Sequence, residues 1–208
     1  MIAEGGDFRQ AVSELHLAHP ANPQQRITMV LTEAEILQQA GELSDALDVL
    51  TDALQIYAED IDLLYARAML AGELDRLDLL ERDLRKVVGM EPDNVHALNA
   101  LGYTLADRTA RQQEALSFIN RAAELSPDNP FVLDSLGWVY YRLGQHQRAL
   151  EYLYQAFELM RDNEILAHLG EVLWVSGQQA EARKLVDEGL KISPEDPILL
   201  ELFDRLTP

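Results

Sequence analysis

Aromatic rings that recur beside carboxylates are the residues of this sequence best suited to recognising another molecule. Trp138 and Tyr141 follow Asp134 at helical spacing, and Trp174 follows Glu171 in the same way. Exposed rings next to acids suit a ligand segment that carries Lys or Arg, through stacking, cation–π contact and hydrogen bonds. The alternative is that these rings pack between helices, because aromatic residues at helical spacing are commonly core.

Residues that could perform catalysis or hold a metal do not converge in the sequence. The five histidines are scattered without an H-E-x-x-H motif, and Cys is absent. We therefore expect surface histidines rather than a zinc site; they are His16, His19, His96, His146 and His168. A phosphate-binding G-x-x-x-x-G-K-[ST] loop, a G-x-S-x-G elbow and a D-x-D-x-D-G calcium loop are also lacking. These observations predict a chain that is not an enzyme and takes no cofactor or metal.

Composition points to helices and away from nucleic acid. The apolar share of 48% suffices for a packed core, and no alternating strand pattern bounded by Asn-Gly or Asp-Gly occurs. The formal net charge is −19, from 36 acidic and 17 basic residues, which repels phosphate backbones and anionic lipids. This surplus either keeps an elongated surface soluble or attracts a basic partner. No apolar run is long enough to span a bilayer, so no direct membrane insertion is expected.

The stretch from Pro130 to Arg161 predicts two antiparallel helices joined by a tight turn. Leu143 and Gly144 interrupt the helical pattern and mark the turn. Gly costs about 1 kcal/mol inside a helix, so its use there suggests a place where two helices cross closely. The small and apolar residues recur at three- and four-residue steps, at Leu133, Leu136, Gly137 and Tyr140, and again at Ala149, Leu153 and Ala156.

This unit recurs along the chain and resembles the tetratricopeptide repeat (TPR) family. A large apolar residue, Leu-Gly, an aromatic residue and later Ala return with a period of about 34 residues, as in that family. The resemblance implies an all-α, right-handed solenoid of helix-turn-helix repeats in one array of about twelve helices. The predicted parts are a half repeat at 1–26, repeats at 27–60, 61–94, 95–129, 130–162 and 163–196, and a capping helix at 197–208.

The resemblance also implies a concave groove, lined by the first helix of each repeat, that binds proteins or peptides. Repeat positions two, five, nine and twelve should point into this groove. The expected partner-binding residues are Tyr65, Met69, Asn99, Tyr103, Phe131, Asp134, Trp138, Tyr141, Glu171 and Trp174. Two functions stay open: a binding scaffold or adaptor, and a structural module for self-association or assembly of a cell-envelope machine.

Three runs carry a narrower resemblance, to the C-terminal part of TPR lipoproteins from Gram-negative envelopes. They are LNALGYTLADRT at 98–109, DSLGWVYYRLG at 134–144 and AHLGEVLW at 167–174. Some proteins of that kind are adaptors for periplasmic carboxyl-terminal processing proteases. The resemblance thus implies a protease or its substrates as partner and a location at the periplasmic face of the outer membrane.

The beginning of the sequence matches the middle of a repeat. Gly5-Gly6 followed by residues 8–18 fits a turn and a second helix without a first helix. We therefore expect a fragment of a longer protein, in which the fragment itself carries no targeting signal.

Overall fold

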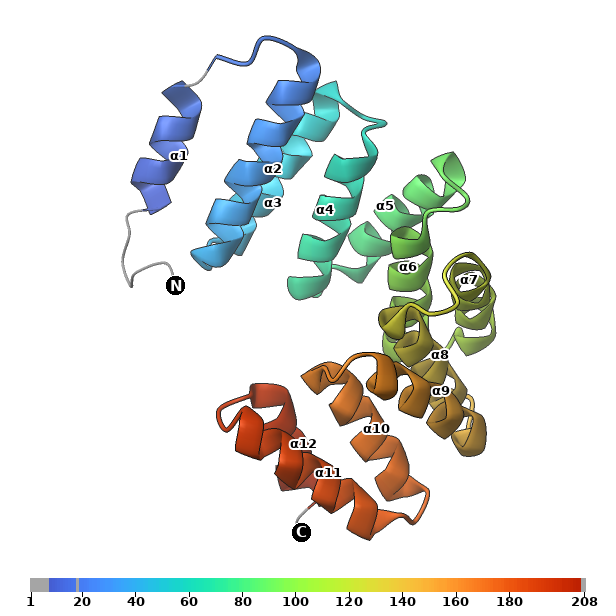
Figure 1. Ribbon diagram of the computed structural model, residues 1–208. Coiled ribbons are helices and arrows are strands. Elements are labelled where there is room, and N and C mark those ends of the chain that lie inside the picture. The colour runs from blue at the N-terminus through green and yellow to red at the C-terminus, as the bar shows by residue number, and fades with distance from the viewer. Residues whose placement is uncertain (1–7, 18, 207–208) are drawn as a thin grey trace. The chain divides into compact units, whose positions relative to one another are not determined.

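The computed structural model describes residues 8–17 and 19–206, and within these ranges it holds twelve α-helices and no strand (Figure 1). The all-α prediction is therefore confirmed. The helices are α1 (Phe8–Leu17), α2 (Pro23–Gln39), α3 (Leu43–Ile56), α4 (Ile61–Glu73), α5 (Leu77–Met90), α6 (Val95–Arg108), α7 (Gln112–Leu125), α8 (Pro130–Arg142), α9 (His146–Leu159), α10 (Asn163–Val175), α11 (Gln179–Ile192) and α12 (Pro197–Leu206). The Gly5-Gly6 turn lies outside the described residues.

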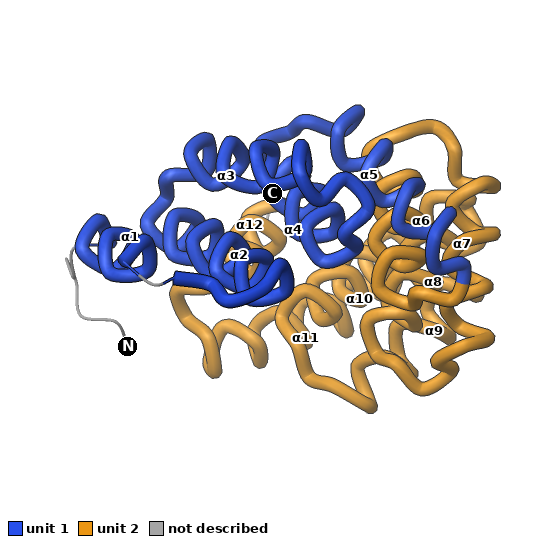
Figure 2. Tube along the Cα trace, turned by 90° about the horizontal axis from the view of Figure 1, so that it is seen from above, with its two compact units in different colours: residues 1–92 blue, residues 93–208 orange. Residues whose placement is uncertain are grey.

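The chain divides into two compact units, which are described separately (Figure 2). Unit 1, residues 1–92, contains α1 to α5, and unit 2, residues 93–208, contains α6 to α12. In both units a first helix packs against the second helix of the same repeat, as in the pairs α4–α5 and α8–α9. No helix in the described ranges combines the length and the apolar character needed to cross a membrane.

Most first helices begin at the residue that the repeat period predicts: Ile61, Val95, Pro130, Asn163 and Pro197. The reason is local, because an Asn or Asp precedes each of them and can cap the free backbone N–H groups of the first turn. The Asn129 side chain, for example, accepts a hydrogen bond of 3.0 Å from the backbone N–H of Phe131. Only α2 starts earlier than predicted, at Pro23 instead of Ile27, since Asn22 caps it and Pro is favoured at the first helical position.

Gly137 lies where α8 and α9 cross most closely, as predicted. A Cβ atom built there would be 2.4 Å from Leu153 Cγ and 3.1 Å from the carbonyl oxygen of Ala149. Gly102 makes the same approach to Ile119 between α6 and α7. The glycines therefore set the distance between the two helices of a repeat.

Unit 1 departs from this pattern through a buried ion pair between α4 and α5. Arg67 Nε and Nη2 lie 2.7 and 3.0 Å from the two carboxylate oxygens of Asp83, which is 1% exposed. Arg67 is the seventh residue of its helix, where α6 and α8 place Leu101 and Leu136. The pair thus replaces an apolar contact of the other repeats.

The first helices of unit 2 lie side by side, because α8 contacts both α6 and α10. We call the surface formed by these three helices the first-helix face. It carries most of the residues predicted to bind a partner.

Candidate functional site

Trp138 lies at the centre of the first-helix face and is only 8% exposed. Its ring stacks on the imidazole of His168, with ring centroids 4.2 Å apart and an angle of 25° between the planes. The indole Nε1–H donates a hydrogen bond of 3.1 Å to Asp107, and the ring of Tyr141 lies at a centroid distance of 5.0 Å. Of the two interpretations of the rings, packing between helices therefore holds for Trp138 and exposure does not, because α10 brings an imidazole over the ring.

His168 connects the three first helices. Its Nδ1 lies 2.9 Å from each carboxylate oxygen of Asp134 on α8, and its Nε2 lies 3.4 Å from the hydroxyl of Tyr103 on α6. Both His168 and Asp134 are buried. The prediction that His168 is a surface residue is wrong, and Asp134 contacts this imidazole instead of lying open in a groove.

The charge state of His168 reflects this setting. Burial lowers its pKa, but the hydrogen bond and charge of Asp134, with the charges of Glu164 and Glu171, act in the opposite direction and the net pKa is raised. An imidazolium here neutralises a buried carboxylate, which would otherwise be costly to keep ionised.

Charged pairs surround the buried centre. Arg142 Nη1 lies 3.0 Å from Asp107, while Glu171 accepts a 3.0 Å hydrogen bond from the Tyr141 hydroxyl and pairs with Arg205 on α12 at 2.9 Å. Burial and the nearby Glu171 raise the pKa of Tyr141 to about 12. A surface depression of about 410 Å³ opens here, lined by Trp138, Tyr141, Arg142, Gly144 and Glu171.

A second part of the face carries unbalanced negative charge. Partial burial raises the pKa of Glu164, and the carboxylates of Asp134, Asp162 and Asp107 raise it further against the opposing charge of His168. The Tyr103 hydroxyl has a raised pKa through burial and through Glu164, Asp107 and Asp134. This region favours a cation.

Family models support the architecture directly. Two models of the tetratricopeptide repeat match residues 65–130 and 140–202, together more than half of the chain. The chain belongs to the TPR family. A TPR repeat-containing protein of Pseudomonas aeruginosa is 44% identical over 171 residues, which are 82% of this chain and 29% of that protein. The chain thus spans less than a third of the length of this relative.

Solved TPR structures share the fold. A thermophilic TPR protein of Thermus thermophilus is 22% identical and matches with a TM-score of 0.76, covering 89% of this chain and 98% of that one. A TPR protein of Parabacteroides merdae is 19% identical, with a TM-score of 0.80 over 97% of this chain and 79% of that one. TPR proteins generally act as protein-interaction scaffolds, and their domains bind other proteins or peptides.

The TPR repeats distribute the remaining predicted residues over several places. Asn99 lies on α6, one turn before Tyr103, and its Oδ1 is a buried atom without a hydrogen-bond partner among the described residues. Phe131, at the start of α8, is 50% exposed. Trp174 lies under the guanidinium of Arg183, which is 5.0 Å from its ring centroid.

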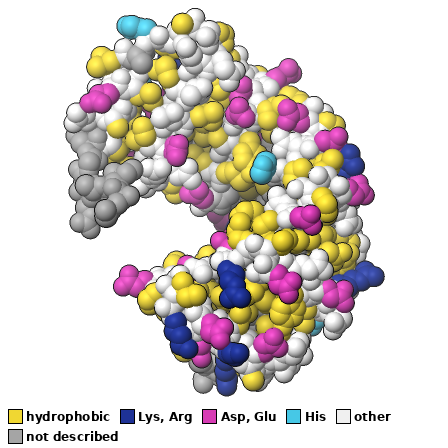
Figure 3. Space-filling view, in the orientation of Figure 1, with side chains coloured by type: hydrophobic (Ala, Val, Ile, Leu, Met, Phe, Trp, Pro, Cys, Tyr) yellow, Lys and Arg dark blue, Asp and Glu magenta, His cyan; other side chains and the backbone are white. Residues whose placement is uncertain are grey.

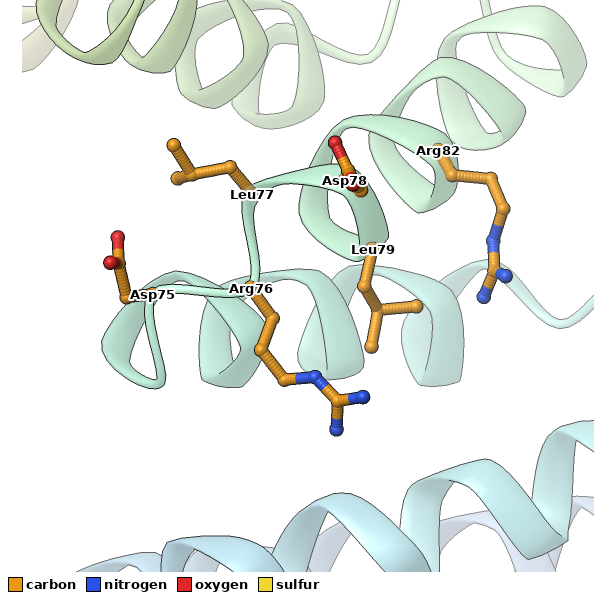
Figure 4. A pocket seen from close by; sticks show the side chains of 6 residues that line it. All are labelled: Asp75, Arg76, Leu77, Asp78, Leu79 and Arg82. Carbon is orange, nitrogen blue, oxygen red and sulfur yellow. The ribbon is translucent and has the colours of Figure 1, made fainter.

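Tyr65 and Met69 belong to unit 1, where both are half-buried on α4. Unit 1 also has a depression of about 570 Å³ at the turn between α4 and α5 (Figure 4). Figure 4 shows Arg76 and Leu79 extending to one side of this turn and Leu77 to the other. Because these side chains diverge, the depression lacks the converging polar groups of a ligand site.

His168 is the residue of the site that sequence reasoning missed. His168 is the sixth residue of α10, and the sixth residues of α6 and α8 are the small Ala100 and Ser135. The repeat pattern therefore did not indicate that a side chain at this position contacts other repeats. The carboxylate partner of His168 lies one repeat earlier and its hydroxyl partner two repeats earlier. Within the described part of the chain, no group of three or more His, Asp or Glu side chains is arranged to hold a metal ion.

Proposed function

We propose that this TPR chain is a non-catalytic adaptor, which binds an extended segment of another protein along the first-helix face of unit 2. The segment carries Lys or Arg and at least one apolar or aromatic side chain. The observation that carries the proposal is the cluster of negative charge around Glu164. The pKa of the Glu164 carboxyl group is raised by partial burial and, further, by three nearby carboxylates.

Charge complementarity supports a basic segment. Asp107 and Glu171 are already paired with Arg142 and Arg205, whereas Glu164 has no ion pair among the described residues. A ligand Lys or Arg would supply the missing cation. The surplus of acidic residues over the whole chain would speed the approach of a basic segment. In the view of Figure 3, carboxylates are spread over the surface and Lys and Arg are fewer.

Aromatic and amide groups next to Glu164 would hold the rest of the segment. The half-buried rings of Tyr103 and Tyr141 offer surfaces for stacking and cation–π contact. Asn99 offers an amide group on the same helix as Tyr103. Trp138 would act from beneath, by supporting Tyr141, rather than as the exposed ring that the sequence suggested.

A pair of peptides tests this proposal. One peptide alternates Lys with Tyr, and the other has the same length with Glu in place of Lys; binding is measured by isothermal titration calorimetry. We expect the basic peptide alone to bind, with an affinity that falls as salt is added because exposed charges are screened. The Glu164→Gln variant should bind it more weakly, whereas Glu158→Gln, an exposed site on α9, should not. An equal loss of peptide affinity in both variants would mean that the net charge of the protein attracts the peptide without a specific binding site.

The narrower form of the proposal names the partner as a periplasmic carboxyl-terminal processing protease or its substrate, with this chain part of an outer-membrane lipoprotein. Its support is the resemblance of residues 98–109, 134–144 and 167–174 to envelope TPR lipoproteins. Size-exclusion chromatography with the purified protease of the same source tests the partner. A full-length sequence that lacks a lipoprotein signal with its Cys would contradict the location.

Self-association in a cell-envelope assembly is the second candidate, and exposed apolar side chains in unit 2 favour it. They include Phe131, Leu159, Ile192 and Ile198. Sedimentation velocity distinguishes the two functions, since a closed oligomer of the purified chain favours assembly and a monomer that binds the basic peptide favours the adaptor.

A further inference from the structure

The place of His168 between helices has a geometric cause. The imidazole occupies a helical position that α6 and α8 give to Ala100 and Ser135, so a large polar ring stands where the neighbouring repeats have a small side chain. It therefore reaches out of α10 and contacts Asp134 on α8 and Tyr103 on α6.

We infer that His168 is a proton-sensitive latch between the first helices of unit 2. As an imidazolium it holds α10 against α8 through Asp134. As a neutral imidazole it leaves the Asp134 carboxylate buried without a counter-ion, which loosens α10 from α8 and uncovers Trp138.

The hydrogen bonds can be counted in both protonation states. Nδ1–H donates to Asp134 in either state. Nε2 donates to the Tyr103 oxygen when it is protonated, and accepts from the Tyr103 hydroxyl when it is not. Titration therefore changes the charge and keeps the number of hydrogen bonds, so the energy of the latch is electrostatic.

The surroundings make that charge important. The titratable and charged groups around His168 are Tyr103 and Asp107 from α6, Asp134 and Arg142 from α8, Glu164 and Glu171 from α10, and Arg205 from α12. Arg142 and Arg205 are paired with Asp107 and Glu171. The imidazolium is thus the cation in contact with the buried Asp134.

The sign of the pH effect follows from the direction of the shift. The folded pKa of His168 is raised above its ordinary value, so the latch contributes stability that is complete below about pH 6.5. That stability is lost as the pH rises through the folded pKa. Unit 2 should hold its first helices together in mildly acidic solution and loosen them on the alkaline side.

The latch would also regulate the ligand site, because the charge of His168 lowers the pKa of Glu164. This link rests on the proposed function, whereas the latch itself does not. If the pH transition is observed but the basic peptide does not bind, the latch is supported and only its link to a ligand site is refuted.

Trp138 is the reporter for the experiment. Trp174→Phe leaves Trp138 as the only tryptophan, since the chain has 2. Its emission wavelength and its quenching by acrylamide are measured in the 208-residue chain from about pH 5 to about pH 9. We expect a single transition with a midpoint above about 6.5, with longer-wavelength emission and stronger quenching at high pH.

Two His variants make the assignment in this background. His168→Gln should abolish the transition, and the matched change His146→Gln, at a ring 5.7 Å from Tyr141, should keep it. NMR titration of the unsubstituted chain gives a reading that needs no variant. A His168 midpoint at or below about 6.5, or a Trp138 transition that survives in His168→Gln, would overturn the latch.

Discussion

The indole of Trp138 is enclosed by His168, Tyr141 and Asp107, so a substitution there acts first on folding. We expect Trp138→Ala to lower the free energy of unfolding by about 3–5 kcal/mol, as for other large buried aromatic residues. Urea denaturation followed by circular dichroism measures it. Phe131→Ala, at a half-exposed ring, should change stability by less than about 0.5 kcal/mol. Similar stability of the two variants would show that the indole is not part of the core.

Asp134 sets the proton affinity of its partner. Its hydrogen bond and its charge raise the pKa of His168 against the opposing effect of burial. In Asp134→Asn that burial should dominate, and NMR titration should give a His168 pKa below the value in the unsubstituted chain. Glu151→Gln, an exposed carboxylate on α9, is the control for the general loss of one charge. An unchanged midpoint would mean that the wider acidic field, and not this pair, holds the proton.

Sequence alone located much of this cluster at the residue scale. The repeat positions place five residues of the cluster on one face, and the structure brings these residues together: Tyr103, Asp134, Trp138, Tyr141 and Glu171. It could not determine how deeply they lie, since burial depends on side chains from other repeats. The imidazole that covers Trp138 comes from the next repeat.

At the scale of the helix, the spacing between α8 and α9 depends on the missing side chain of Gly137. Gly137→Ala should destabilise the fold by about 1–3 kcal/mol, because the new methyl group collides with Leu153. Gly89→Ala is the matched control, since a Cβ atom there has no neighbour within 4 Å. It should stabilise α5 by up to about 1 kcal/mol through helix propensity. If the denaturation midpoints of Gly137→Ala and Gly89→Ala shifted in the same direction, the close approach of α8 and α9 at Gly137 would be contradicted.

The ion pair between α4 and α5 calls for a double-mutant cycle. Arg67→Leu leaves the buried Asp83 with only the exposed Arg82 at 3.2 Å, and Asp83→Phe leaves Arg67 without its carboxylate, so each change should cost about 3–5 kcal/mol. The double variant copies the apolar pair at the same helical positions of α6 and α7, Leu101 and Phe118. It should cost less than either single change, because no buried charge remains. Additive losses would show that the two side chains do not act as a pair.

Helix boundaries were the part of the fold most open to prediction. They are set by local chemistry, an Asn or Asp cap followed by the first turn, and this chemistry is visible in the residues themselves. The start of α2 differs from the predicted repeat boundary at residue 27, because Asn22 caps the helix and makes Pro23 its first residue. The ion pair between Arg67 and Asp83 was not predicted, because the two residues lie on different helices, 16 residues apart, and neither residue type alone indicates its partner.

On the scale of the whole chain, charge is the dominant global property. With a net charge of −19, added salt should raise the melting temperature, since screening of like charges outweighs the loss of exposed ion pairs. Thermal unfolding in sodium chloride from about 0.01 M to about 0.5 M measures this. A neutral osmolyte at matched osmolality is the control. A melting temperature that falls with salt would mean that the surface pairs contribute more than the repulsion.

Repeat proteins gain and lose length by whole repeats, because each repeat ordinarily contacts only its neighbours. His168 departs from that rule, since it contacts Asp134 in the neighbouring repeat, 34 residues away, and also Tyr103 two repeats earlier, 65 residues away. A foreign TPR repeat with other residues at these helical positions, inserted at the 162–163 boundary, would keep every local helix pair and still remove both contacts. The three-way contact therefore requires one repeat, and no more, between the repeat that carries Tyr103 and the repeat that carries His168.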